Sequence, residues 1–221
     1  MDQSRHLGLY SIPYYMRVTL IGAGGIGALA AVTLTKMGIN FLNIWDGDKV
    51  DPINLATQLH RVSDVGKSKV DAVAGVAHMF SDEARVTPFN TPVHELSEFG
   101  NSEIVISAVD SITARQAIWQ AVIRNNPPWY LDTRMSAEVF QMHVINMESH
   151  SARNAYDNMI RNLQESDVPD VVCTEKATFF CAAMASGHIG AAVKRIVTGD
   201  DKSYQVVHYI ATNTLYELGL A

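Results

Sequence analysis

The stretch from Val18 to Gly27, which reads VTLIGAGGIG, constrains the fold of this chain more than any other segment. An apolar, β-branched run comes first, a cluster of glycines follows, and a small-residue segment with helical character comes next. Further along, a second apolar run ends in Asp46 and Asp48. A buried strand, a glycine turn, a helix and a second strand ending in carboxylates are the parts of a nucleotide-binding βαβ unit.

The glycines of this turn have separate expected roles. Gly22, Gly24 and Gly25 leave room for a tight turn and for a phosphate close to the backbone, and Gly27 lets the helix lie against the sheet. The start of the helix offers free N–H groups and the positive end of its dipole to an anion. Asp46, 24 residues after Gly22, is placed to accept hydrogen bonds from a ribose. Glycine runs also occur in purely structural turns, so it is the strand, the helix and the acid together that favour nucleotide binding.

Composition narrows the class of protein. A chain of 221 residues that is 48% hydrophobic and 18% charged is typical of one compact globular domain. The net charge of −6, without a basic run, gives no reason to expect nucleic acid as a partner. The N-terminal residues lack an apolar signal core, and the most apolar stretch, residues 179–193, is too short to span a bilayer. Two cysteines make no disulfide framework. We therefore expect a cytoplasmic protein that does not insert into membranes.

Strand and helix patterns alternate along the chain. We predict strands at residues 16–21, 40–45, 85–89, 103–108 and 129–132, and helices at 25–37, 67–80 and 111–125. After a Pro-Pro pair, we predict strands at 138–146, 204–210 and 214–217, helices at 151–164 and 177–198, and a polar loop at 165–176. The fold class is α/β, with a doubly wound, Rossmann-like, mostly parallel sheet extended by antiparallel strands. Residues 1–221 form a single domain, with a nucleotide-binding half at about 16–133 and a crossover loop and C-terminal half at about 134–221.

A second polar cluster separates the possible kinds of nucleotide chemistry. Between Asp46 and Lys69 the chain supplies carboxylates, the amides of Asn54 and Gln58, and lysines, whereas a dehydrogenase needs little here beyond one ribose-binding acid. Such groups suit a triphosphate and its metal ion. Lys69, near the start of a helix, can reach the phosphates as a mobile point charge. Asp110, after the fourth strand, offers the hard oxygen ligand that Mg²⁺ prefers.

The pattern GxGGxG, then DxD, then NLxxQ, then GxxK, then an aspartate after the fourth strand resembles the ThiF/MoeB/HesA family, which includes the adenylating domain of ubiquitin-activating enzymes. The resemblance runs from about residue 17 to 199. It implies ATP-dependent adenylation of the C-terminal carboxylate of a small ubiquitin-like or sulfur-carrier protein ending in Gly-Gly, with release of pyrophosphate. It also implies that Asp46 binds the ribose, that Asn54, Gln58 and Lys69 lie at the phosphates, that Asp110 holds Mg²⁺, and that the protein is a homodimer.

The chain departs from this family at several places. An arginine usually precedes the glutamine of the NLxRQ motif, but Thr57 stands here, which removes a cation from the phosphate site. His60, Arg61 or Lys67 are candidates to replace it, and the sequence does not choose among them. Family members often supply an N-terminal arginine to the site of the neighbouring subunit. In this sequence Arg5 is the only early candidate for that role. Many relatives carry two CxxC pairs for zinc, and this chain has none.

Cys173 lies in the polar loop where some relatives place a cysteine that takes the activated carrier as a thioester or persulfide link. A nucleophilic thiolate and an unreactive loop thiol are both open readings. Cys181 is expected to be core packing, and His143 a structural histidine on a strand. Asp132, Arg134 and Glu138 are expected to form a structural ion-pair cluster, with a role facing the nucleotide or the carrier as the alternative. The small-residue face of the last helix is expected to pack closely against the sheet or against a second subunit.

Three functions follow in order of preference. The first is an adenylyltransferase that activates a carrier protein, with Lys69, Asp110 and Cys173 as catalytic residues. The second is a nucleotide-binding scaffold without catalysis, because of the missing arginine at position 57. The third is an NAD-dependent oxidoreductase, although nothing in the sequence marks a hydride-transfer pocket.

Overall fold

The computed structural model describes residues 4–164 and 177–220 of the chain. Its strands are β1 (Arg17–Ile21), β2 (Phe41–Trp45), β3 (Arg85–Phe89), β4 (Ile104–Ser107), β5 (Trp129–Ser136), β6 (Val139–Asn146), β7 (Tyr204–Tyr209) and β8 (Thr214–Gly219). Its helices are α1 (Gly25–Met37), α2 (Lys69–His78), α3 (Ile112–Asn125), α4 (His150–Asn162) and α5 (Phe179–Val197), with short 3-10 turns at Pro52–Ala56 and Val62–Asp64.

The described strands form one eight-stranded sheet in the order β3-β2-β1-β4-β5-β6-β7-β8. All neighbours from β3 to β5 are parallel, and all neighbours from β5 to β8 are antiparallel. This confirms the predicted α/β fold with a mostly parallel, doubly wound sheet extended by antiparallel strands. The change of strand order at β1, from which the chain runs outward in both directions, is the place where such sheets bind ligands.

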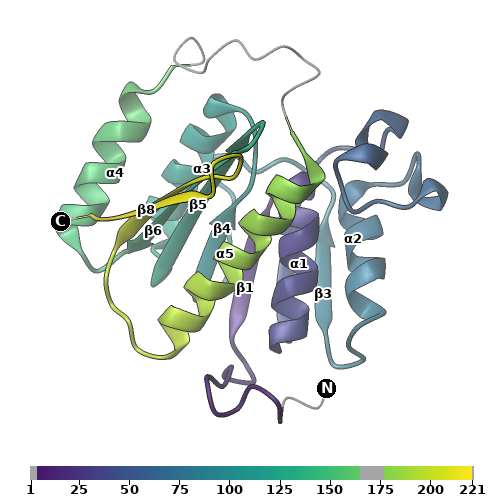
Figure 1. Cartoon of the computed structure of the whole chain (residues 1–221), viewed down its shortest axis with the longest axis horizontal. Helices are drawn as coiled ribbons and strands as arrows, with labels where there is room; N and C mark the ends of the chain where they lie inside the picture. Colours follow the sequence, from purple (N-terminus) through teal and green to yellow (C-terminus); the bar gives the residue numbers. More distant parts are fainter. Residues whose placement is uncertain (1–3, 165–176, 221) are drawn as a thin grey trace.

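Helices cover both faces of the sheet, and each face has its own core. On one face, α1 and α5 lie side by side and α2 packs next to α1 (Figure 1). On the other face, α3 and α4 bury Trp119 and Tyr156 against β5 and β6. The two layers explain why the central strands β1 and β4 are buried along almost their whole length, because such strands are covered on both sides.

One side of α5, with several of its small residues, packs against α1, and the opposite side is exposed. Ser186 and Gly190 face α1, where the Ser186 hydroxyl lies 2.6 Å from the Thr33 hydroxyl. A Cβ atom on Gly190 would come within 3.0 Å of the Thr33 methyl group, so the two helices approach as closely as their backbones allow. The opposite side, which includes Phe180 and Met184, is exposed. The close packing of this face is therefore against α1, whereas the sequence analysis expected the sheet or a second subunit.

The predicted boundaries agree with the observed elements to within about two residues, with one clear exception. The strand predicted at 129–132 runs on to Ser136, because it pairs antiparallel with β6 along its whole length, from Trp129 opposite Asn146 to Ser136 opposite Val139. Such pairing partners lie outside the segment itself, so a local pattern underestimates the strand. None of the described helices is long and apolar enough to cross a bilayer.

Candidate nucleotide site

The carboxyl ends of β1, β2 and β4 are aligned in the sheet, next to the middle of β5. Ile21 of β1 lies opposite both Trp45 of β2 and Ser107 of β4, and Ser107 lies opposite Asp132 of β5. The residues that follow these positions therefore meet at one edge of the sheet. That edge carries the glycine turn, Asp46 and Asp110.

Two glycines between β1 and the start of α1, Gly22 and Gly27, have no space for a side chain. Gly22 has φ +99°, and a Cβ atom there would lie 2.5 Å from the carbonyl oxygen of Ala108. A Cβ atom on Gly27 would collide with the carbonyl of Gly22. Gly24, the N-cap of α1, makes no side-chain cap, and the first turn of the helix contains no acidic residue. This is the arrangement that binds phosphate groups at helix N-termini.

Asp46 holds the glycine turn to the end of β2. One carboxylate oxygen accepts a hydrogen bond of 2.7 Å from the backbone N–H of Ala23, and the other accepts one of 2.8 Å from the backbone N–H of Asp48. Each oxygen keeps a second lone pair. The side chain predicted to bind the ribose therefore also shapes the loop on which a nucleotide would rest.

Lys69 is paired with Asp48 beside this turn. Its ammonium lies 2.7 Å from an Asp48 carboxylate oxygen, and its backbone N–H donates to the carbonyl of Asp48 at 2.9 Å. The Lys69 side chain is 11% exposed, while that of Asp48 is 72% exposed. Because the acid is well hydrated, the ion pair is weak and the lysine can exchange this partner for a phosphate.

The two amides predicted at the phosphates have different surroundings. The carbonyl oxygen of Asn54 accepts from the backbone N–H of Asp51 at 3.1 Å, in a reciprocal cap of the 3-10 turn. Gln58 instead lies against the glycine turn, with its amide nitrogen 3.7 Å from the position of a Cβ atom on Gly24. Among the described residues, the Gln58 carbonyl oxygen is buried without a hydrogen-bond partner. A buried acceptor without a donor beside a phosphate-binding turn is suited to a polar ligand.

The three candidate replacements for the family arginine differ in their contacts. Arg61 and Lys67 both pair with Asp64, at 2.7 and 3.0 Å. The hydrogen bond from Arg61 is the main cause that lowers the pKa of Asp64 far below its usual range. His60 lies under the glycine turn, where its Nε2 is 3.1 Å from the Ala23 carbonyl, and burial lowers its pKa. Arg61 and Lys67 thus have a structural partner already, and burial disfavours the charged form of His60.

Asp110 follows β4 and is exposed. The backbone just before it is tied to the glycine turn, since the N–H of Ala108 donates to the carbonyl of Ile21 at 2.7 Å. In the described part of the chain, no group of three or more His, Cys, Asp or Glu side chains is arranged to hold a metal ion. Mg²⁺ usually keeps several waters and binds one or two carboxylates together with phosphate oxygens. A single exposed aspartate beside a glycine turn at a helix N-terminus fits that mode.

A buried ionic network lies next to Asp110, and the sequence analysis found only part of it. The predicted pair of Asp132 and Arg134 is present, at 3.0 Å. Arg115 from α3 is the missed member: its guanidinium donates to Asp132 and to the carbonyl of Val109. Its spacing within a helix gave no sign of burial. Burial alone would raise the pKa of Asp132, but the charges of Arg115 and Arg134 outweigh it and lower that pKa.

His143 and the two cysteines complete the predicted residues. His143 is buried opposite Asp132, and burial lowers its pKa to about 4. Its Nδ1 atom has no hydrogen-bond partner among the described residues. Cys181 is buried as expected, and burial raises the pKa of its thiol to about 11. Cys173 lies outside the described residues.

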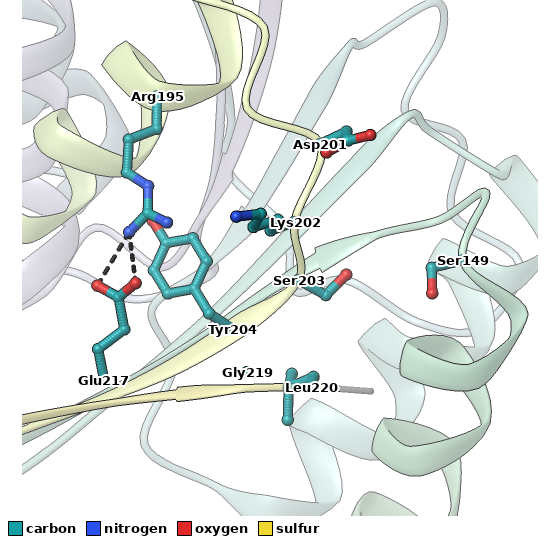
Figure 2. A pocket seen from close by; sticks show the side chains of 9 residues that line it. All are labelled: Ser149, Arg195, Asp201, Lys202, Ser203, Tyr204, Glu217, Gly219 and Leu220. Atoms are coloured by element: carbon teal, nitrogen blue, oxygen red, sulfur yellow. Dashed lines mark hydrogen bonds and ion pairs between the residues drawn. The ribbon is translucent and has the colours of Figure 1, made fainter.

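A second hollow lies on the antiparallel side of the molecule. Figure 2 shows that it is lined by Arg195, Lys202, Tyr204 and Glu217, among others, from α5 and the last two strands. Arg195 is bound to Glu217 at 2.9 Å and to Asp200 at 2.7 Å, and its guanidinium lies over the Tyr204 ring. These side chains already satisfy one another, and none of the predicted nucleotide-binding residues lines this hollow.

Comparison with known proteins gives matches in both sequence and fold. A sequence model of the ThiF family matches residues 12–217. The adenylyltransferase and sulfurtransferase uba4 of Neosartorya fischeri is 36% identical over 113 residues, covering 51% of this chain and 22% of that protein. Ubiquitin-like modifier-activating enzyme 5 of Drosophila virilis is 30% identical over 128 residues, covering 51% of this chain and 32% of that protein. The chain thus matches between about a fifth and a third of the length of these relatives.

Solved structures with the same fold include PaaA in its selenomethionine form, with a TM-score of 0.73 and 20% identity over 94% of this chain and 74% of that one. Another is E. coli MccB with ATP, with a TM-score of 0.70 and 14% identity over 94% of this chain and 65% of that one. At such identities the likeness shows the fold alone.

Proposed function

The chain belongs to the ThiF family, and from this premise we propose that it is an ATP-dependent adenylyltransferase acting on the C-terminal carboxylate of a small ubiquitin-like or sulfur-carrier protein. The observation that carries the proposal is the uncapped N-terminus of α1 above a glycine turn, with the unpartnered Gln58 carbonyl beside it. The printed names of the relatives, an adenylyltransferase and a modifier-activating enzyme, support the same reaction class.

The proposed reaction joins a carboxylate oxygen of the carrier to the α-phosphorus of ATP and breaks the bond to the β-phosphate, so that pyrophosphate leaves. The carboxylate is already ionised at neutral pH, so no general base is required. Catalysis then depends on aligning the carboxylate with the α-phosphate and on neutralising the negative charge of the phosphates. The N–H groups of α1 bind phosphate oxygens, Asp46 accepts from the ribose, and Lys69 leaves Asp48 to face the phosphates. Asp110 would hold Mg²⁺, which supplies further positive charge to the triphosphate.

Transfer of the activated carboxylate to the thiolate of Cys173, with release of AMP, is a second proposed step. The thiolate would form the new bond to the carbonyl carbon, and AMP would be the leaving group. Replacing Cys173 by alanine is expected to spare adenylate formation and to abolish a covalent carrier adduct.

We also infer a homodimer. The exposed side of α5 carries Phe179, Phe180 and Met184 between small residues, and an exposed apolar patch of this kind commonly marks a protein contact. The mass in solution, measured by sedimentation, tests this part of the proposal.

The experiment is carrier-dependent exchange of labelled pyrophosphate into ATP. The carrier is a purified ubiquitin-like protein ending in Gly-Gly, and the same protein without the two glycines is the negative control. Lys69→Met is expected to lower kcat/KM by about 10²- to 10³-fold, because a charge that meets the phosphates is lost. Lys202→Met, a lysine of the second hollow, should leave the exchange unchanged.

A non-catalytic scaffold is the competing function, and one observation favours it. Thr57 stands where relatives have an arginine, and both nearby cations, Arg61 and Lys67, are paired with Asp64. ATP binding by calorimetry without any pyrophosphate exchange would support the scaffold and overturn the adenylyltransferase.

A further inference from the structure

The carboxylate of Asp110 makes no hydrogen bond or ion pair with any other described residue, and the side chain is exposed. Every other acid of the candidate site is held by a partner: Asp46 by two backbone N–H groups and Asp48 by Lys69. The position of Asp110 therefore depends on its backbone. What fixes the backbone at Val109 and Asp110 decides where this carboxylate points.

One side of that backbone lies against the glycine turn. The N–H of Ala108 donates to the carbonyl of Ile21 at 2.7 Å. A Cβ atom on Gly22 would lie 2.5 Å from the carbonyl oxygen of Ala108 and 3.3 Å from the nitrogen of Val109. The segment before Asp110 and the glycine turn are thus in direct contact, and neither can move far without the other.

The other side is held by Arg115. This residue lies in the first turns of α3, its side chain is 4% exposed, and its guanidinium donates at the same time to the Val109 carbonyl and to an Asp132 oxygen. A planar guanidinium can serve two acceptors in fixed directions, which an ammonium cannot do in the same geometry. Arg115 therefore connects the backbone before Asp110 to the end of β5.

Asp132 is itself fixed in place. Its second oxygen accepts from Arg134 Nε at 3.0 Å, and its side chain is fully buried. The adjacent Thr133 hydroxyl donates to the Ser107 carbonyl at 2.8 Å, which ties β5 to the end of β4. The orientation of Arg115 is accordingly set by two neighbouring strands.

We propose that Arg115 is a positioning residue that places Asp110 at the glycine turn by holding the Val109 carbonyl, with Asp132 orienting the guanidinium. The inference rests on the proposed function for the role of Asp110. It makes Arg115 act through Asp110, without touching nucleotide or carrier.

The test uses Arg115→Lys with Arg134→Lys as the matched control. Both variants keep a positive charge next to Asp132, but only the first changes the contact with Val109. In the unliganded protein, amide hydrogen exchange of the peptide covering residues 108–111 should be about tenfold faster in Arg115→Lys and unchanged in Arg134→Lys. This readout needs no activity, so it remains valid if the proposed function fails.

A double-mutant cycle with Asp110→Asn supplies the second readout. For Mg²⁺-dependent binding of ATP and for pyrophosphate exchange, Arg115→Lys alone should lose about tenfold, while Arg115→Lys combined with Asp110→Asn should be no weaker than Asp110→Asn alone. Arg134→Lys should combine with Asp110→Asn additively. If Arg115→Lys does not fold, Arg115→Gln, which is neutral but keeps an N–H donor, takes its place.

The outcomes separate the two claims. Unchanged exchange at residues 108–111 in a folded Arg115 variant overturns the positioning role, whatever the activity. Losses that multiply in the double variant also overturn it, because they would show that Arg115 acts independently of Asp110. A wild-type protein without ATP turnover, combined with faster exchange in Arg115→Lys, would overturn the proposed function and leave the structural link intact.

Discussion

Two carboxylates in this molecule are each completely buried and each paired with two cations, yet they differ in where the cations lie. We refer to Asp64 with Arg61 and Lys67 as the Asp64 cluster, and to Asp132 with Arg115 and Arg134 as the Asp132 cluster. In the Asp64 cluster the cations are 47% and 53% exposed. In the Asp132 cluster they are 4% and 20% exposed. The same charges are therefore hydrated in one cluster and largely desolvated in the other.

The two clusters also differ in how far apart their residues lie in the sequence. In the Asp64 cluster all three residues lie within seven positions, and both pairs are three residues apart. In the Asp132 cluster Arg115 comes from α3, and Asp132 and Arg134 come from β5. When one residue of a surface cluster is removed, water can hydrate the charges that remain. Water cannot hydrate the remaining charges of a buried cluster in the same way.

The largest expected effect is that of Asp132→Ala. It leaves Arg115 and Arg134 without their counter-charge, and Arg115 is fully buried, so the free energy of unfolding should fall by about 3–5 kcal/mol. Denaturant unfolding followed by circular dichroism measures this. A loss below about 1 kcal/mol would mean that water reaches the buried arginine.

A further test of the comparison is the loss of folding stability at acid pH. It involves His143, which lies opposite Asp132. Burial lowers the pKa of His143 to about 4, from about 6.5 in an unfolded chain. As the pH falls from 6.5 to 4, the unfolded chain takes up this proton first, so the folded state loses stability over that range. The lost free energy is on the order of 1–3 kcal/mol. In His143→Gln, stability measured by denaturant titration should fall less between pH 6.5 and 4 than in the wild type.

Two other titratable groups, Asp132 and His60, do not alter the comparison between the wild type and His143→Gln. The pKa of Asp132 is lowered, so its stabilisation is lost only when the pH falls below about 4. His60 also has a pKa lowered by burial, but it is present in both proteins and cancels. Equal pH slopes for wild type and His143→Gln would contradict a neutral, buried His143.

The smallest expected effect is that of Asp64→Ala. Arg61 and Lys67 are half exposed and can return to water, so the free energy of unfolding should fall by only about 1–2 kcal/mol, mostly through lost hydrogen bonds. High salt should reduce the wild-type contribution, because exposed charges are screened. If Asp64→Ala lowers the free energy of unfolding as much as Asp132→Ala does, the exposure of the cations does not determine the loss of stability.

The candidate site was predictable where its residues are close in sequence. The glycine turn, the acid at the end of the second strand and the lysine at the start of α2 follow from local patterns, because the parallel strands bring their carboxyl ends to one edge. Arg115 was not predictable as a contact of Val109. Its burial depends on the packing of α3 against β5, which no local pattern specifies.

The amino-acid sequence by itself determined the alternation of strands and helices, the family, and the position of the glycine turn, because these depend on local periodicity and on glycines that admit no side chain. Only the tertiary structure decided that the small-residue face of α5 packs on α1, that β5 extends to Ser136, and that Arg115 binds the Val109 carbonyl next to Asp110. Those features depend on contacts between residues far apart in the chain. Their energies come from burial and desolvation, which exist only once the layers have packed together.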